Sequence, residues 1–191
     1  MGRIVVTEFV SLDGVMEDPG GAEGYEHGGW TFAFDRGEGD DFKLQETLDT
    51  EALLLGRTTY EGFAAAWPSR EGEFADKFNR MPKFVVSSTL KQPDWNNSTV
   101  LEGDLAEDVA RLSSSVGGNI VVHGSAQLVQ ALIERELLDE LRLMVFPVLL
   151  GSGKRLFGET SDTRPLRLTS SKSVGEGIVI LTYEPARPQA D

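Results

Sequence analysis

The sequence predicts an α/β fold with a mostly parallel sheet and an antiparallel C-terminal edge. First, runs rich in β-branched residues alternate with helical segments over residues 3–146, an order typical of parallel sheets. Second, two strand-like segments with no helix between them end the chain, which favours an antiparallel pair. Third, 191 residues with an apolar fraction of 40% suffice for one core, and no linker divides them. We therefore expect a single domain over residues 1–185 and a tail over 186–191.

The first strand and the first helix are separated by a long loop. Residues 3–10 are β-branched and lead into a Ser-Leu-Asp-Gly turn, so they are expected to form a strand. Phe42, Gln45 and Leu48 follow one another at intervals of three residues, which predicts a helix over residues 40–49. The glycine-rich segment 14–39 is longer than a simple connection and is typical of a lid or a binding loop.

The rest of the chain repeats the strand–helix order and then ends in strands. Continuous apolar runs predict buried strands, and the helix that ends at residue 136 carries one apolar stripe. Capping-box patterns begin two of the helices, from Thr58 to Glu61 and from Asp104 to Glu107. The expected strands are residues 52–55, 83–87, 119–123, 141–146, 166–172 and 177–184, and the expected helices are 58–67, 104–115 and 126–136.

The composition narrows the classes of function. The chain has no cysteine and only two histidines, which excludes disulfides and zinc ribbons and disfavours a multi-histidine metal site, so we expect no metal. No segment has the ~20 apolar residues of a membrane span, and no signal peptide is recognised, so we expect a cytoplasmic protein and no membrane partner. A net charge of −13 argues against a nucleic-acid partner, since phosphate binding depends on Lys and Arg.

The charges are unevenly distributed along the chain. Residues 1–51 hold 13 acidic side chains and three basic ones, whereas residues 142–172 hold six basic and two acidic ones. One interpretation is that acidic surfaces aid solubility and vary from place to place. The other is that the N-terminal segment borders a site that disfavours phosphorylated ligands, because like charges repel at short range.

Three strand ends carry glycine and hydroxyl side chains. They are Gly56-Arg57-Thr58-Thr59, Ser87-Ser88-Thr89 and Gly124-Ser125-Ala126-Gln127. In open α/β sheets, ligands bind outside the carboxyl ends of the strands, where helix starts present free N–H groups to phosphates. Arg57 and the second turn suit a further phosphate, while Ser125 is placed either to cap its helix or to donate to an oxygen. Such residues also occur in ordinary turns, but three of them at one edge favour a nucleotide site.

Two other motifs are incomplete. Gly151 to Lys154 resembles the end of a P-loop, but Arg155 stands where Ser or Thr is required to bind magnesium. Ser125 lies at a strand-to-helix turn, as the nucleophile of many hydrolases does, but His123 and Gln127 replace the glycines of that motif. A serine hydrolase therefore stays open as a minor alternative.

Five segments together resemble a known family. They are Ser11–Gly14, Leu54–Glu61, Val85–Thr89, Ile120–Leu128 and Phe146–Gly153. In this order they resemble the dihydrofolate-reductase-like superfamily and, within it, the RibD C-terminal (riboflavin-pathway pyrimidine reductase) domain family. The resemblance implies a mixed sheet of about eight strands with helices on both faces, NADPH as hydride donor, and a homodimer. It places the adenosine 2′-phosphate near Arg57 and Ser87–Thr89, and the pyrophosphate at Gly124–Leu128.

The resemblance also indicates candidates for the substrate site, beneath residues 11–40. Asp13 belongs to the family motif and is a candidate to orient substrate or relay a proton, or else a plain turn residue. Asp40 lies where dihydrofolate reductases carry the carboxylate that supports pterin protonation, or is simply part of an acidic first turn. The candidates for stacking on a planar heterocycle, with the core as their alternative place, are Trp30, Phe63 and Trp67.

We therefore expect an NADPH-dependent reductase that acts on a small heterocyclic substrate, pyrimidine or pteridine-like. Val15 stands where pyrimidine reductases of this family tend to carry a basic residue, which together with the acidic segment disfavours a phosphorylated substrate. The alternative is a non-catalytic nucleotide- or ligand-binding protein on the same fold.

Overall fold

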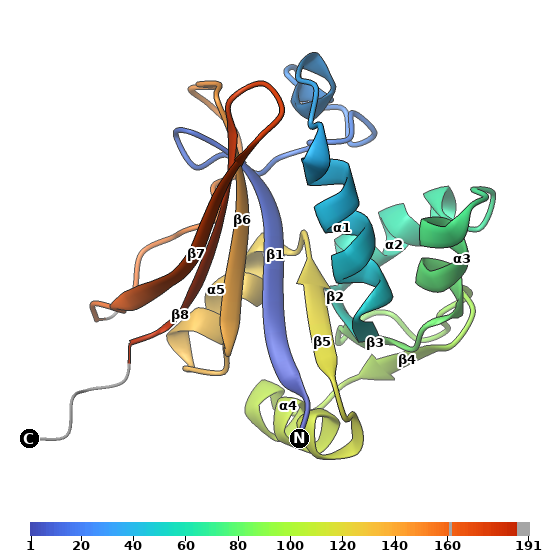
Figure 1. Cartoon of the computed structure of the whole chain (residues 1–191). Helices are drawn as coiled ribbons and strands as arrows, with labels where there is room; N and C mark the ends of the chain where they lie inside the picture. The colour runs from blue at the N-terminus through green and yellow to red at the C-terminus, as the bar shows by residue number, and fades with distance from the viewer. Residues whose placement is uncertain (161, 187–191) are drawn as a thin grey trace, which may run out of the picture.

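The computed structural model of the chain describes residues 1–160 and 162–186. An eight-stranded sheet with the order β4-β3-β2-β5-β1-β6-β8-β7 forms its centre (Figure 1). The strands are β1 (Arg3–Ser11), β2 (Thr50–Gly56), β3 (Lys83–Val86), β4 (Ser98–Leu101), β5 (Asn119–His123), β6 (Glu140–Phe146), β7 (Leu166–Val174) and β8 (Ile178–Pro185). All neighbours from β4 to β6 are parallel, whereas β8 is antiparallel to both β6 and β7. The predicted fold class is confirmed.

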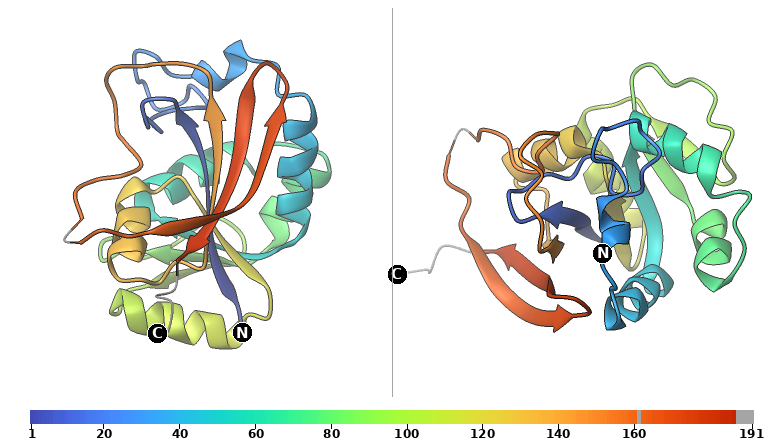
Figure 2. Two further views of the ribbon diagram at one scale, coloured as in Figure 1. Left: turned by 60° about the vertical axis from the view of Figure 1, so that its left-hand side comes forward. Right: turned by 90° about the horizontal axis from the view of Figure 1, so that it is seen from above.

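Helices cover both faces of this sheet (Figure 2). They are α1 (Glu38–Leu48), α2 (Arg57–Ala66), α3 (Glu73–Arg80), α4 (Leu105–Ser115) and α5 (Ala126–Glu134), with a short 3-10 turn, η1 (Trp30–Ala33). The helices α4 and α5 pack on one face through Leu112 and Leu132. The other face is covered by α1, α2 and α3, through Phe42, Tyr60 and Phe78. No helix of the described part of the chain is long and apolar enough to cross a membrane.

The core on the α1–α3 face is divided in two by polar residues. One apolar cluster lies around Leu55 and Phe78, and a second lies around Met144 and Phe146. Between them, β5, β1 and β6 place His123, Thr7 and Arg142 in register across three neighbouring strands. Because cross-strand neighbours point to the same face, these three side chains form a polar row in an otherwise apolar surface. Burying polar groups is unfavourable unless they are paired, so the row calls for a physical explanation.

Besides η1, the structure adds two elements that the sequence analysis did not predict, α3 and β4. The helix α3 has eight residues, and its rings at Phe74 and Phe78 pack against Trp67 at the end of α2. The strand β4 has four residues and lies at the edge of the sheet. The strand β4 is too short for a clear pattern. The helix α3 does carry a helical pattern, with Phe74 and Phe78 four residues apart, which the sequence analysis did not use. Of the residues expected to form a C-terminal tail, 187–191 lie outside the described part.

The two predicted capping boxes have different outcomes. Asp104 does cap α4, since its carboxylate accepts hydrogen bonds from the N–H groups of Ala106 (2.9 Å) and Glu107 (3.3 Å). The capping box at Thr58 is wrong, because α2 begins one residue earlier, after Gly56, and has no side-chain cap. Glu61, the expected partner of Thr58, accepts instead from the guanidinium of Arg57.

Candidate functional site

Two strand-to-helix turns are joined side by side at the carboxyl edge of the sheet. The N–H group of Gly56 donates to Oγ of Ser125 (2.9 Å), and the N–H group of Ser125 donates to Oγ1 of Thr59 (2.9 Å). Gly124 has φ +58°, and a Cβ at this position would lie 2.9 Å from Oγ1 of Thr59. Glycine is therefore required there for both conformation and space. The reciprocal bonds hold the starts of α2 and α5 next to each other.

The start of α5 presents unpaired backbone donors. Its first helical hydrogen bond runs from Val129 N–H to the carbonyl of Ser125 (3.0 Å), so the N–H groups of Ala126, Gln127 and Leu128 have no helical acceptor. The prediction that Ser125 caps this helix is wrong, because its hydroxyl binds the β2–α2 turn instead. Free N–H groups and two adjacent positive helix ends suit a diphosphate. The residues present at this edge therefore fit a dinucleotide.

The second predicted phosphate site also lies at this edge. Strands β2 and β3 pair up to Gly56 and Val86, so the chain continues into Arg57 and Ser87 from adjacent points. Arg57 is half-exposed and forms an ion pair with Glu61 at 3.1 Å. Exposed pairs of this kind are weak, so little free energy is lost when Arg57 turns to another anion. Ser87 uses its hydroxyl to accept from two backbone N–H groups, while Ser88 and Thr89 are exposed.

Glu8 lies where β1 and β5 separate, immediately after the last pair between these strands, Thr7 and His123. Its Oε2 accepts a hydrogen bond from the N–H group of Gly124 (3.0 Å), and no described residue donates a hydrogen bond to the buried Oε1. Burial raises the pKa of Glu8 well above its ordinary value, and the bond from Gly124 offsets only part of this effect. Sequence reasoning did not select Glu8, although an acidic residue inside a β-branched strand was a usable signal.

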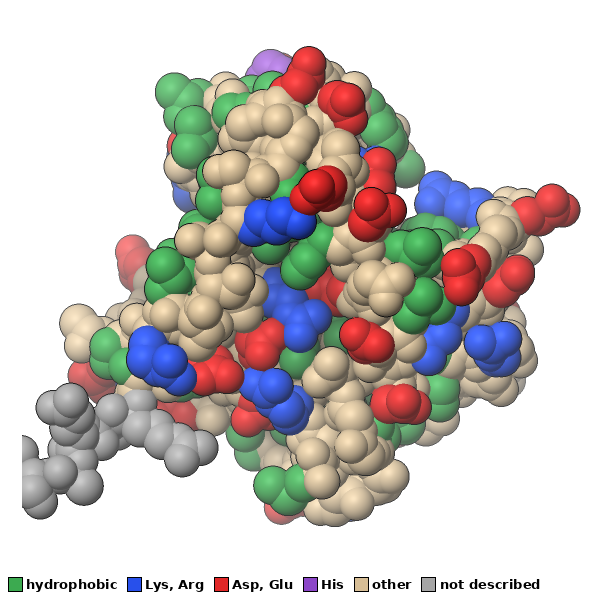
Figure 3. Space-filling model, viewed as in Figure 1, with side chains coloured by type: hydrophobic (Ala, Val, Ile, Leu, Met, Phe, Trp, Pro, Cys, Tyr) green, Lys and Arg blue, Asp and Glu red, His purple; other side chains and the backbone are tan. Residues whose placement is uncertain are grey.

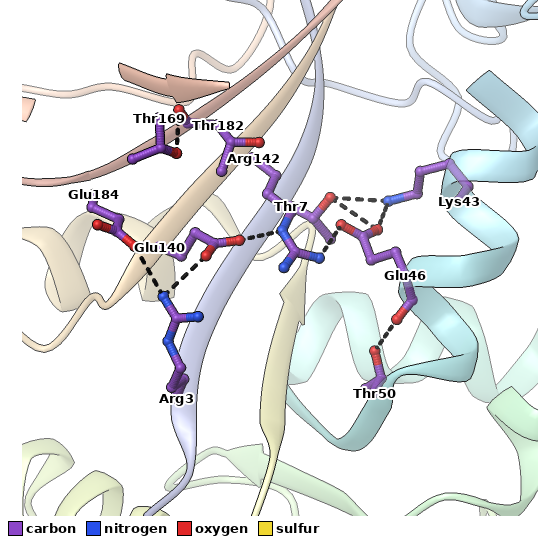
Figure 4. Close-up of polar contacts among 10 residues, drawn as sticks. All are labelled: Arg3, Thr7, Lys43, Glu46, Thr50, Glu140, Arg142, Thr169, Thr182 and Glu184. Atoms are coloured by element: carbon purple, nitrogen blue, oxygen red, sulfur yellow. Dashed lines mark hydrogen bonds and ion pairs between the residues drawn. The ribbon is translucent and has the colours of Figure 1, made fainter. Parts of the chain in front are cut away.

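We define the polar band as Thr7, Lys43, Glu46, His123 and Arg142; Figure 4 shows all of these residues except His123. Glu46 is at its centre, with only 1% of its side chain exposed. One carboxylate oxygen accepts from the Thr7 hydroxyl (3.1 Å) and from Lys43, and the other accepts from Arg142 (3.2 Å). Lys43 also donates to the Thr7 hydroxyl (2.9 Å). These contacts satisfy the buried polar groups and hold α1 against β1 and β6.

The electrostatics of the band are set by Glu46 and its two cations. Burial alone would raise the pKa of Glu46, but the positive charges of Lys43 and Arg142 outweigh burial and hold this pKa below its ordinary value. The pKa of His123 is also lowered, to about 3, because for an imidazole burial and the nearby charge of Lys43 act in the same direction. The imidazole is therefore neutral near pH 7. Sequence reasoning missed the band, because its members come from four elements far apart in the chain.

Neither of the two carboxylates predicted to be catalytic is a buried group that keeps a proton. Asp40 is wrong as the buried carboxylate: 65% of its side chain is exposed, and it forms an ion pair with Arg36 at 2.9 Å. Asp13 accepts hydrogen bonds from the Ser11 hydroxyl (2.6 Å) and from the N–H group of Gly151 (2.8 Å). These bonds lower the pKa of Asp13 to about 2, so it is ionised at neutral pH and poorly suited to carry a proton. Asp13 joins its loop to the β6–β7 connection, and its role in orienting substrate stays a prediction.

The structure does not bring the three predicted stacking residues together. Trp30 is buried, donates from its ring nitrogen to the carbonyl of Glu17 (2.8 Å), and packs edge-on against Phe146. Phe63 and Trp67 belong to the other apolar cluster, where they contact each other. Each of the three rings therefore lies in or against an apolar cluster, which is the alternative place named for it, and a stacking role stays a prediction.

The acidic N-terminal segment is partly neutralised by the basic C-terminal one. Four of the six basic residues in 142–172 form ion pairs with acidic residues of 1–51: Arg142 with Glu46, Lys154 with Glu17, Arg155 with Asp13 and Lys172 with Glu38. On the face seen in Figure 3, acidic side chains extend over the upper part and the right side, and the basic side chains at the centre have acidic ones beside them. The pairing weakens the charge-based expectation that phosphorylated ligands are repelled.

The sheet order, the antiparallel edge and the helices on both faces define a fold shared with reductases. A pyrimidine reductase-like protein from Corynebacterium diphtheriae is similar, with a TM-score of 0.66 and 14% identity, over 97% of this chain and 92% of that one. Dihydrofolate reductase from Enterococcus faecalis, solved as a complex with NADP(H), has a TM-score of 0.62 and 16% identity, over 97% of each chain.

The family follows from the sequence match. The family model of the RibD C-terminal domain matches residues 3–180, so the chain belongs to this family. The uncharacterized protein YwjB of Bacillus subtilis (strain 168) is 31% identical over 178 residues, which cover 92% of this chain and 94% of YwjB. Among the residues that the structure describes, no group of three His, Cys, Asp or Glu side chains is arranged to hold a metal ion.

Proposed function

We propose that this chain is an NADPH-dependent reductase of a small heterocyclic substrate, pyrimidine or pteridine-like. One observation carries the proposal: the starts of α2 and α5 are joined by hydrogen bonds, and α5 presents free N–H groups. This pair of helix starts lies where β1 and β5 separate, beside the polar band. An anionic dinucleotide fits the first part of this arrangement. A small polar ring fits the second, because the band is a cluster of paired but partly accessible polar groups.

The residues of this chain would divide the work between binding and electrostatics. The N–H groups of residues 126–128 would hold the diphosphate, and Arg57 with the exposed hydroxyls of Ser88 and Thr89 would hold the 2′-phosphate. Bound there, NADPH would supply the hydride. Lys43 and Arg142 would stabilise negative charge that develops on a heteroatom of the substrate, since preorganised cations act strongly where water is excluded.

Binding of NADPH and NADH, followed by calorimetry, tests the cofactor half of the proposal. The Arg57→Ala variant is expected to bind NADPH about tenfold more weakly, the loss of about 1.4 kcal/mol typical of one charge-assisted contact, and to bind NADH as before. Arg167→Ala is the matched control, because Arg167 is also an exposed arginine in an ion pair, with Glu184 on β8. Absence of NADPH binding at micromolar concentration would contradict the proposal.

Turnover distinguishes a reductase from a binding protein. Oxidation of NADPH is followed by absorbance with a panel of pyrimidine and pteridine substrates, each with and without a phosphate. A reductase oxidises NADPH with at least one of them. Binding of NADPH without any turnover would instead favour the non-catalytic alternative.

A further inference from the structure

The hydrogen-bond pattern of the polar band leaves its carboxylate fully occupied. Both oxygens of Glu46 accept hydrogen bonds, from Thr7 and Lys43 on one side and from Arg142 on the other. Since 1% of this side chain is exposed, a ligand has no access to its remaining lone pairs. Glu140, which binds Arg142, is likewise occupied by Arg3. No described carboxylate of the band therefore offers an acceptor to a ligand.

Most of the hydrogen-bonding groups of the band that have no partner among the described residues are N–H donors. Lys43 has three N–H groups, of which Thr7 and Glu46 accept two. Arg142 has five, and among the residues that the structure describes its acceptors are Glu46 and Glu140 alone. These two cations are also the reachable members of the cluster around Glu46, with 12% and 17% of their side chains exposed. Their free N–H groups are what a ligand would meet.

His123 does not change this balance. A neutral imidazole has one donor and one acceptor nitrogen, and neither carries a charge. Its ring packs edge-on against Phe78, which limits the directions from which a ligand approaches. The band thus contains two cations, Lys43 and Arg142, and one anion, Glu46. None of its members is a carboxylate with two oxygens free to accept hydrogen bonds from a ligand.

We propose that Lys43 and Arg142 select substrates that present oxygen acceptors, either ring carbonyls or a carboxylate, and that the site rejects rings whose binding edge is an amidine. A protonated amidine places two donors side by side and carries a positive charge, so it binds best to a free carboxylate, through two parallel hydrogen bonds. Here it would meet two cations, and like charges at short range are unfavourable. This inference rests on the proposed function, because it assigns the substrate half of the same site.

Three pyrimidines of equal ring size test the selection. They are 2,4-dioxopyrimidine, its 6-carboxylate and 2,4-diaminopyrimidine, each titrated into the whole chain saturated with NADP⁺ and followed by ligand-observed NMR. At least one of the two oxo rings is expected to bind about tenfold or more tightly than the diamino ring. Binding of the neutral dioxo ring identifies the carbonyls as sufficient, and binding of the carboxylate alone identifies the charge as the recognised feature; both support the proposal.

Variants then assign the selection to the two cations. Lys43→Met and Arg142→Met are each expected to weaken binding of the oxo ring about tenfold. Arg142→Lys keeps the charge and serves if the methionine variant fails to fold; it is expected to weaken binding less. Arg3→Met is the matched control, because it removes a cation that binds Glu140 from outside the band. Far-ultraviolet circular dichroism and NADP⁺ binding verify the fold of every variant.

The outcomes separate this inference from the proposed function. Binding of the diamino ring as tightly as the oxo rings, no binding of either oxo ring to a chain that binds NADP⁺, or unchanged affinity in the lysine and arginine variants overturns the inference alone. Failure of the wild-type chain to bind NADP⁺ or NADPH in the parallel titration overturns the proposed function.

Discussion

Removal of the Glu46 carboxylate is predicted to cause a large loss of stability. In Glu46→Ala, Lys43 and Arg142 stay mostly buried without their shared anion, and the Thr7 hydroxyl loses its acceptor. Breaking a buried ion pair by removing one partner costs about 3–5 kcal/mol. We expect about 3 kcal/mol, the lower end, because both cations retain some contact with water. Urea unfolding at neutral pH, followed by circular dichroism, measures the free energy of unfolding.

The control for this prediction is an acidic residue in an exposed ion pair. Glu102 contacts Lys91 at 2.8 Å, and more than half of each side chain is exposed. Glu102→Ala is therefore expected to change the free energy of unfolding by no more than about 1 kcal/mol. If Glu46→Ala costs as little as Glu102→Ala, the band does not stabilise the fold in the way described.

The pH dependence supplies a second test of the same carboxylate. The pKa of Glu46 is lower in the folded chain than its ordinary value of 4.5, so its contribution is fully present above pH 4.5 and is lost as the pH falls through the folded pKa. Glu46→Gln does not titrate and should show a flatter loss of stability over this acid range. An acid limb equal to that of the wild type would refute the assignment.

Three further substitutions test other features. The pKa of Glu8 is raised above 4.5, so above this pH the folded chain keeps a proton that the unfolded chain loses, and the wild type loses stability as the pH rises. Glu8→Gln does not titrate and should become more stable relative to the wild type over this range. If urea unfolding gives the same difference between the two chains at every pH, the prediction is contradicted. Gly124→Ala should cost about 1–2 kcal/mol or more because of its positive φ and its contact with Thr59, whereas Gly117→Ala, which meets no atom within 4 Å, should be nearly neutral. Gly62 lies inside α2, and a Cβ added there would meet no atom within 4 Å. Gly62→Ala should therefore increase the free energy of unfolding by about 0.5–1 kcal/mol and raise the midpoint of thermal unfolding.

Candidate site residues were recognisable from the sequence where the signal lies within a few neighbouring residues, and they were missed where it depends on contacts between distant parts of the chain. The turns after β2, β3 and β5 were recognisable because glycine and hydroxyl residues at strand ends are local signals, and the strand order then brings them to one edge. Asp40 was selected because it lies where dihydrofolate reductases carry a carboxylate, and a position along the chain does not indicate the face of α1 on which a residue lies. Glu46 was not considered. Lys43 and Glu46, three residues apart on one face of α1, were the available clue to the buried face.

The sequence by itself determined the alternation of strands and helices, the antiparallel C-terminal edge and the three turns at the carboxyl ends of the strands. These features arise from hydrophobic periodicity and turn chemistry, which act over a few residues. Only the tertiary structure decided that Glu46 contacts Arg142, 96 positions away, and that Thr7 lies in register with His123. Strand register and the rotation of α1 depend on the packing of the whole sheet, so the buried carboxylate and its cations became recognisable only when the chain was folded.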